Sequence, residues 1–391
     1  MPDTSLDTAY VDLLLGWNAL EQKLGADAVI DFNLLGQTGG TPFTHRLDVL
    51  AALKDLRRRA EREANPLAYR RLSAHEAFLR NRMGEHWDFD PYIAATQGFR
   101  FKLFDDAYLA SRKQALVETL SQWNITYDAK AEKRFEALDS EIPEANVATF
   151  YTDLMARRKP ELEALIGHKA DFNLTIEFAD VDQYWAAWVD GQGKNFRLRF
   201  NRFNVKKHWQ ARSTQLALHE LLAHLVKAAI LRTHIEQKKL PPWLGLTTVH
   251  GPEMFQDEGL AQTLPLFWDV PEGQDPLVQA RCQLSHLSGL VWHNAHIRLH
   301  SGTPLELVVD EVTRWLPWRE AGKVAHGLNS LGNHPLFRSY EFVYGASQDF
   351  FTTLAEGTDK AQHKQVLQAV YTKWLTYDDL LDLRHKVQKA A

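Results

Sequence analysis

The chain has 391 residues and a formal net charge of −5, and because it contains no sustained basic patch we expect no nucleic-acid partner. Its hydrophobic content of 45% and charged content of 24% are ordinary for a soluble protein, and a single cysteine, Cys282, excludes an intrachain disulfide and suits a reducing compartment. No apolar run reaches membrane-spanning length and residues 1–10 lack the basic start of a signal peptide, so we expect a cytoplasmic protein with no membrane partner.

Residues 1–166 are predicted to form a helical N-terminal region. Leucines recur at helical spacing from Leu47 to Leu56, and basic residues occupy the opposite side of the same stretch. Residues 69–83, 105–123 and 147–165 show the same pattern. Because an apolar stripe of this kind is typical of an amphipathic helix, we predict a helix in each stretch.

A small antiparallel sheet is predicted after Gly167, where the pattern changes. Residues 172–178 alternate in strand fashion, and residues 184–189 are aromatic and β-prone. The sequence Asp190-Gly191-Gln192-Gly193 is a turn signal, and residues 196–200 alternate after it. We therefore predict an α+β fold, mainly α with a small antiparallel β-sheet, in which residues 167–391 form a second region.

The strand predicted at residues 196–201 is a candidate for binding an extended substrate. An exposed strand edge can hold a peptide in register through main-chain hydrogen bonds. An ordinary core hairpin is an equal alternative. Arg199, which shares a strand face with Arg197, is a candidate ligand for a substrate carboxylate, with a solvated arginine pair as the alternative.

The sequence His219-Glu220-Leu221-Leu222-Ala223-His224 lies in an apolar run that predicts a buried helix. Neutral imidazole is a good zinc ligand, and a carboxylate beside it can take a proton from metal-bound water. The histidines are five positions apart, which separates them by about 140° on a regular α-helix. A π-bulge, whose backbone bonds link residues five apart, would bring both imidazoles to one ion. The alternative is two separate, buried, hydrogen-bonded histidines.

A second acidic motif, Asp257-Glu258-Gly259, opens another helical stretch further along the chain. Glu258 is the predicted third metal ligand, and Asp257 is a candidate to orient a ligand imidazole. Gly259 would let the helix backbone approach its neighbours closely. Two histidines, one carboxylate base and a distant third ligand predict a hydrolytic site with one Zn²⁺ ion.

Further candidates come from the C-terminal part of the chain. Three histidines recur on one helix face up to His300, and because no carboxylate shares this stripe we expect no second metal there. His300 remains a candidate for lining a substrate cleft. Zinc hydrolases also need a preorganised donor that stabilises the developing oxyanion. The candidates for this role, which the sequence does not rank, are Arg338, Tyr340 and Tyr344.

The pattern H-E-x-x-x-H followed by E-G-L-A resembles the QEGLA-motif family, also described as flavohemoglobin expression-modulating proteins, which includes the microtubule-associated tyrosine carboxypeptidases. The resemblance is clearest over residues 171–264. It implies a zinc metallopeptidase with a gluzincin-like architecture. His219 and His224 match the metal-binding histidines of the family, Glu220 matches its general base, and Glu258 matches its third ligand.

This chain departs from the family motif at two places. Leu222-Ala223 stands where the family has Gly-Thr, and Asp257 replaces the glutamine of QEGLA, differences that bear on substrate preference more than on metal binding. A group of bacterial helical metallopeptidase-like proteins, with E-G-W-A in place of E-G-L-A, is similar as well. That second similarity lies in the helical N-terminal half and in residues 298–302.

From these residues we predict a zinc-dependent, carboxypeptidase-like enzyme that acts on a peptide or protein substrate, with its catalytic domain in residues 167–391. Glu220 would accept a proton from metal-activated water and deliver it to the leaving amine. Another metal-dependent amide hydrolase and a non-peptidase metal-binding helical protein are the alternatives. A carboxylate-bridged iron protein would need further Glu-x-x-His pairs, which the sequence does not supply convincingly. The sequence leaves the oligomeric state and the physiological substrate open.

Overall fold

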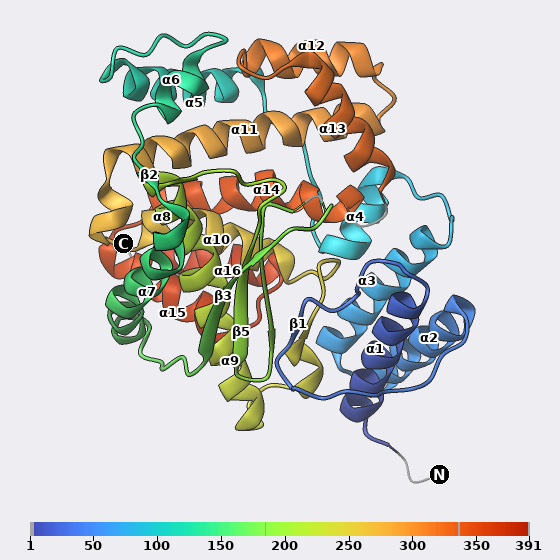
Figure 1. The fold of residues 1–391 in the computed structure, drawn as a ribbon. Coiled ribbons are helices and arrows are strands. Elements are labelled where there is room, and N and C mark those ends of the chain that lie inside the picture. The colour runs from blue at the N-terminus through green and yellow to red at the C-terminus, as the bar shows by residue number, and fades with distance from the viewer. Residues whose placement is uncertain (1–3, 184, 335–336, 390–391) are drawn as a thin grey trace.

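The structure, a computed structural model, describes residues 4–183, 185–334 and 337–389. It is mainly helical and contains a small mixed sheet (Figure 1), which confirms the predicted α+β class. Tyr184, at the start of one predicted β-prone stretch, lies outside the described residues. None of the described helices is long and apolar enough to cross a membrane.

Helices fill most of the described part of the first 166 residues, as the apolar stripes predict. They are α1 (Leu6–Lys23), α2 (Arg46–Arg62), α3 (Pro66–Arg82), α4 (Phe89–Gln97), α5 (Asp106–Ser121), α6 (Ala131–Glu136) and α7 (Glu144–Ile166). In α2 the buried stripe includes Val49 and Leu53, whereas Leu47 in the first turn is 65% exposed and does not join it. Figure 1 shows α1, α2 and α3 grouped on one side of the molecule, away from α5.

The rest of the described chain is also mostly helical. Its helices are α8 (Gln210–Ala217), the π-helix η1 (Leu218–Leu225), α9 (Val226–Glu236), the short 3₁₀ turns η2 (Pro242–Gly245) and η3 (Pro271–Gln274), α10 (Met254–Phe267), α11 (Pro276–His300), α12 (Leu305–Trp315), α13 (Ala321–Asn333), α14 (Phe337–Glu356), α15 (Lys360–Thr372) and α16 (Tyr377–Lys389). Helix α14 packs against both α10 and α11 (Figure 1). Glycines permit this close packing, because a Cβ at Gly345 would lie 3.0 Å from the backbone carbon of Gly289 on α11.

Five strands form the mixed sheet in the order β3-β5-β4-β1-β7. They are β1 (Phe32–Asn33), β3 (Asn173–Ala179), β4 (Ala187–Gln192), β5 (Asn195–Asn201) and β7 (Leu246–Thr247). The predicted hairpin is confirmed: β4 pairs with β5 in antiparallel fashion, and Gly193 takes a positive φ of 58° in the turn between them. Phe196, Leu198 and Phe200 of β5 are buried, as alternation predicts. A separate two-stranded ladder joins β2 (Glu141–Ile142) to β6 (His208–Trp209).

Two predictions about the sheet are wrong. The sheet is not purely antiparallel, because β3 pairs with β5 and β1 pairs with β4 in parallel. The predicted substrate strand at residues 196–201 is not an edge either, because β5 lies between β3 and β4. Strand order depends on where distant parts of the chain return to the sheet, and a local alternation pattern does not contain that information.

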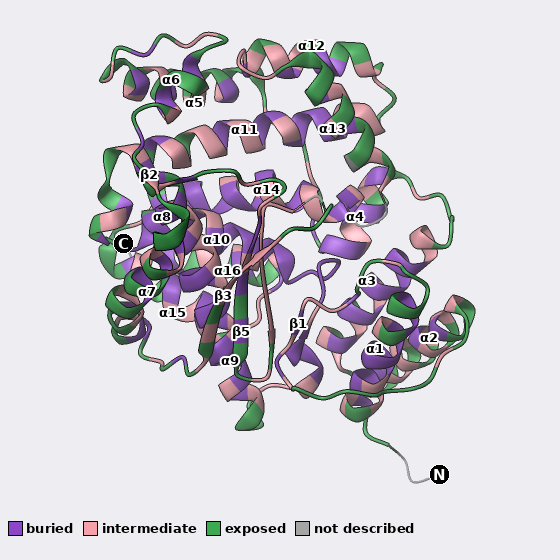
Figure 2. Cartoon of the chain, viewed as in Figure 1, coloured by how far each residue is buried: buried purple, intermediate pink, exposed green. Residues whose placement is uncertain are grey.

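Contacts cross the predicted boundary at residue 166. Strand β1 comes from the N-terminal region yet pairs with both β4 and β7. The guanidinium of Arg71 on α3 donates to Glu253 Oε1 at 2.9 Å, just before α10, and both side chains are buried. Figure 2 shows buried residues on the N-terminal helices as well as around the sheet. The division into regions 1–166 and 167–391 stays a prediction.

Candidate metal centre

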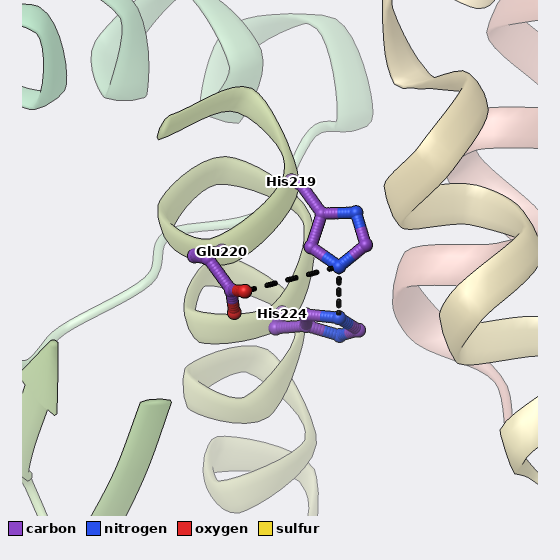
Figure 3. A group of neighbouring side chains, drawn as sticks. All are labelled: His219, Glu220 and His224. Atoms are coloured by element: carbon purple, nitrogen blue, oxygen red, sulfur yellow. Dashed lines mark hydrogen bonds and ion pairs between the residues drawn. The ribbon is translucent and has the colours of Figure 1, made fainter. Parts of the chain in front are cut away.

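The two motif histidines lie on a continuous helical rod whose middle is a π-helix. Helix α8 leads directly into η1, and η1 leads directly into α9. Because π-helical bonding aligns residues five apart, His219 and His224 project from the same side of the rod. Figure 3 shows their imidazoles one above the other. The predicted widening of the helix is confirmed.

Three donor atoms converge beside this π-helix. His219 Nε2 lies 3.2 Å from His224 Nε2, and Glu258 Oε2 on α10 lies 3.6 Å from the first nitrogen and 3.8 Å from the second. A tetrahedral zinc ion with bonds of about 2.0–2.1 Å would hold its donor atoms about 3.3 Å apart. Glu258 Oε2 is also buried and has no hydrogen-bond partner among the described residues, as a ligand oxygen would without its ion. The donor set and its spacing therefore fit one zinc ion.

Both imidazoles are held in the form that a metal requires. Burial lowers the pKa of His219 well below its usual value, and the neighbouring His224 lowers it further. Burial also lowers the pKa of His224 to about 3, with a smaller effect of the ammonium of Lys227. Both rings are therefore neutral at pH 7, which leaves a nitrogen lone pair on each ring for a metal.

Glu220 also lies beside the two imidazoles, but its carboxylate is farther from them than the carboxylate of Glu258. Its Oε1 is 4.0 Å from His219 Nε2, and the ligand atoms of His219, Glu220 and His224 all lie within 4.8 Å of one another (Figure 3). Burial raises the pKa of the Glu220 carboxyl to about 8. A carboxylate with a pKa near neutrality is suited to accepting and returning a proton.

Two tyrosines on α14 face the centre and are linked to it by hydrogen bonds. The hydroxyl of Tyr340 donates to Glu258 Oε1 at 2.8 Å, and the hydroxyl of Tyr344 donates to that of Tyr340 at 2.5 Å. Burial raises the pKa of both phenols well above the usual value, so both remain protonated donors at neutral pH. Tyr340 thereby fixes one carboxylate oxygen and turns the other towards the imidazoles.

Asp257 has a different partner from the predicted one. It forms an ion pair with Lys227 on α9 rather than a hydrogen bond with a ligand imidazole. This pair ties the start of α10 to the rod that carries the histidines. The structure therefore gives Asp257 a role in holding the two helices together and not in orienting a ring.

Three other candidate residues contact groups outside the candidate centre. Arg338 donates to Asn81 Oδ1 and to the carbonyl of Trp87, so its guanidinium links α14 to the N-terminal helices. The guanidinium of Arg199 donates to Asp190 Oδ2 at 2.6 Å, and Asp190 lies on β4, the neighbouring strand of the hairpin. The ring of His300 stacks on Phe89 with centroids 4.0 Å apart.

Two cavities meet at the candidate centre. Cavity 1 encloses about 350 Å³ and is bounded by residues of β1, β4, β7, η1, α9, α10 and α14. Cavity 2 encloses about 410 Å³ and is bounded by residues of α7, β4, β5, β6, α8, η1, α10, α11 and α14. His219, Glu220 and Tyr344 line both cavities, whereas Arg338, Arg199 and His300 line neither. The centre thus lies at the junction of the two cavities.

Sequence reasoning missed several charged residues that line these cavities, and three of them bear on the site. Asp31, just before β1, and Glu341, next to Tyr340, line cavity 1. Arg212, on α8, lines cavity 2. Arg212 stands seven residues before His219, two helical turns along the same face, which is a signal that the sequence does contain. Asp31 reaches the site only through long-range strand pairing, and no local signal marks it.

Comparison with known proteins supports the fold alone. No family model matches the chain, and no curated protein matches it. A solved structure titled "the putative lipoprotein from Colwellia psychrerythraea" superposes with a TM-score of 0.56 at 12% sequence identity. The match covers 89% of this chain and 64% of that chain, so this chain spans less than two thirds of the length of its structural neighbour.

Proposed function

We propose that the protein is a zinc-dependent peptidase with a gluzincin-like site and carboxypeptidase-like action. The observation that carries the proposal is the convergence of His219 Nε2, His224 Nε2 and Glu258 Oε2 within 3.2–3.8 Å of one another. These three residues would hold the ion. A bound zinc ion lowers the pKa of a coordinated water towards neutrality and polarises a carbonyl oxygen.

The chain's own groups supply the proton transfers and the orientation. Glu220 accepts the proton of the attacking water and delivers it to the leaving amine, for which its raised pKa is suited. Tyr340 keeps the Glu258 carboxylate in place. Tyr344 lines both cavities at the centre, so its hydroxyl is the better placed of the two phenols to rotate towards a substrate oxyanion.

The strand that supports substrate binding is β4 instead of β5. Among the described residues, β4 pairs with β5 from Ala187 to Gln192, but it pairs with β1 only at Gly191 and Gln192. Among the described residues no strand pairs with Ala187 or Val189 on the side of β4 away from β5, and both residues line cavity 1. We infer that a substrate main chain adds to this edge and passes the metal centre.

Arg212 supports the carboxypeptidase-like part of the proposal. Its guanidinium makes no hydrogen bond or ion pair with another described residue, and it lines cavity 2 about two helical turns, or about 10 Å, from His219. A guanidinium is suited to bidentate binding of a carboxylate. In this role Arg212 takes the place that the sequence suggested for Arg199.

The test combines metal analysis with a peptide digest. The purified protein is expected to contain about one zinc per chain, and its cleavage of a peptide library is expected to require a free C-terminal carboxylate. Blocking that carboxylate as an amide should abolish cleavage, and Arg212→Gln should raise KM for free-carboxylate peptides. Cleavage of blocked and free peptides at equal rates would count against carboxypeptidase-like action. Cleavage of non-peptide amides alone would favour another metal-dependent amide hydrolase.

A further inference from the structure

Cavity 1 contains more negative charge than the candidate metal centre uses. The carboxyl groups that line it are Asp31, Glu220, Asp257, Glu258 and Glu341. Asp257 is neutralised by its ion pair with Lys227, and Glu220 and Glu258 both lie beside the imidazoles. Asp31 and Glu341 are left over, with no role in the hydrolytic site.

Neither of these two carboxyl groups has a side-chain partner in the described part of the chain. Among the described residues, no hydrogen bond or ion pair joins the side chain of Asp31 or Glu341 to another group. Both are partly buried, and burial raises the pKa of each to about 7, with the charge of Asp190 adding to the effect at Asp31. A partly buried carboxylate without a counter-charge is destabilising, so two of them in one cavity favour a cationic ligand.

The walls of cavity 1 also suit a cation. Trp185 and Trp188 line it, and the guanidinium of Arg199 already lies over the ring of Trp185, 5.3 Å from its centroid. Aromatic faces attract ammonium and guanidinium groups. Cavity 2 differs, because its charged lining residues are Lys207, Arg212 and Glu220, of which only Glu220 is acidic. The two sides of the candidate centre therefore differ in the charge that they would accept.

We propose that cavity 1 is a subsite for a cationic group of the substrate, a primary ammonium or a guanidinium, bound by Asp31 and Glu341. Charge-assisted hydrogen bonds to the carboxylates hold the cation, and the tryptophan rings cover its apolar stem. The inference rests on the proposed function, because it takes the ligand to be the peptide that reaches the metal centre. The cation comes from the N-terminus of the peptide or from a lysine or arginine side chain.

The test measures binding separately from cleavage. Zinc-loaded Glu220→Gln protein is titrated by calorimetry with three sets of hexapeptides. The first set is N-acetylated and carries one lysine at a different position in each peptide, and the second set replaces that lysine with acetyl-lysine. The third set has a free N-terminus and no charged side chain. Loss of the responsible charge should raise Kd about 10-fold or more, the value expected for one charged hydrogen bond. Adding Asp31→Asn or Glu341→Gln should remove that difference. Glu118→Gln, an exposed glutamate on α5, is the matched control and should preserve it.

Each outcome decides one question. A lysine-dependent difference identifies a side-chain cation, and a difference that depends on the free N-terminus identifies the α-ammonium. Equal Kd values for charged and neutral peptides overturn the inference. Kd for the fully neutral peptide should be the same in the subsite variants, which checks that they fold. Cation-dependent binding without cleavage by the wild-type protein supports the subsite and contradicts the peptidase proposal. Cleavage without a preference for charged peptides supports the peptidase proposal and contradicts the subsite.

Discussion

Gly259, which follows the candidate ligand Glu258, offers the sharpest test of the geometry. A Cβ at this position would lie 2.6 Å from Phe351 Cε2 and 3.1 Å from Ser347 Cβ, both on α14, whereas ordinary contact begins near 3.4 Å. Because Phe351 Cδ2 would lie closer still, Gly259→Ala must separate α10 from α14 by more than about 0.8 Å or displace the buried Phe351 ring. Overpacking of this kind costs about 1–3 kcal/mol, and the better helix propensity of alanine offsets about 1 kcal/mol of it.

The same displacement acts on the metal centre. Glu258 is held between the imidazoles of η1 and the hydroxyl of Tyr340 on α14, so a shift of α10 lengthens distances on one side or the other. We expect Gly259→Ala to lower the free energy of unfolding by up to about 2 kcal/mol and to weaken zinc binding by about 10-fold or more.

Urea unfolding of the metal-free protein and zinc competition against a chelator measure the two effects of Gly259→Ala. Gly322→Ala is the matched control, because Gly322 lies in helix α13 and a Cβ there would meet nothing within 4 Å. The control should be neutral or slightly stabilising. If Gly259→Ala has wild-type stability and wild-type zinc affinity, the packing argument is refuted.

Three further predictions concern single side chains. Glu220→Gln should retain zinc by metal analysis and lose about 10²–10⁴-fold in kcat, and retained turnover would remove the general-base assignment. Tyr340→Phe removes the hydrogen bond to Glu258 Oε1 and should weaken zinc binding about 10–100-fold in chelator competition, while an unchanged affinity would show that the bond does not orient the ligand. In metal-free protein, Glu341→Gln should raise Tm at pH 8 and have little effect at pH 4.5. The reason is that the folded-state pKa of Glu341 is raised to about 7, so the wild type loses stability as pH rises from its unfolded pKa through that value; a Tm difference independent of pH would contradict this.

The features of the site that could be predicted are those encoded by short spacings. The five-residue interval between His219 and His224 required a widened helix, and the helix is π-helical at that place. Glu258 could be located because its motif is contiguous and opens a helix. The predictions that were wrong concern residues and strands whose positions depend on long-range contacts. Arg338 binds Asn81 and the carbonyl of Trp87, which lie far away in the chain, and β1 reaches the side of β4 away from β5 only by long-range pairing.

Strand β1 has a consequence for how the protein folds. Phe32 pairs with Gly191 and with Thr247, partners about 160 and about 215 positions later in the chain, so this ladder closes very long loops. Pairings of such high contact order form late, because loop-closure entropy opposes them until most of the chain is in place. We therefore expect a ribosome-bound chain that has not yet emerged to residue 247 to lack the wall around Asp31. Any peptide hydrolysis would then be confined to chains that have emerged beyond residue 247.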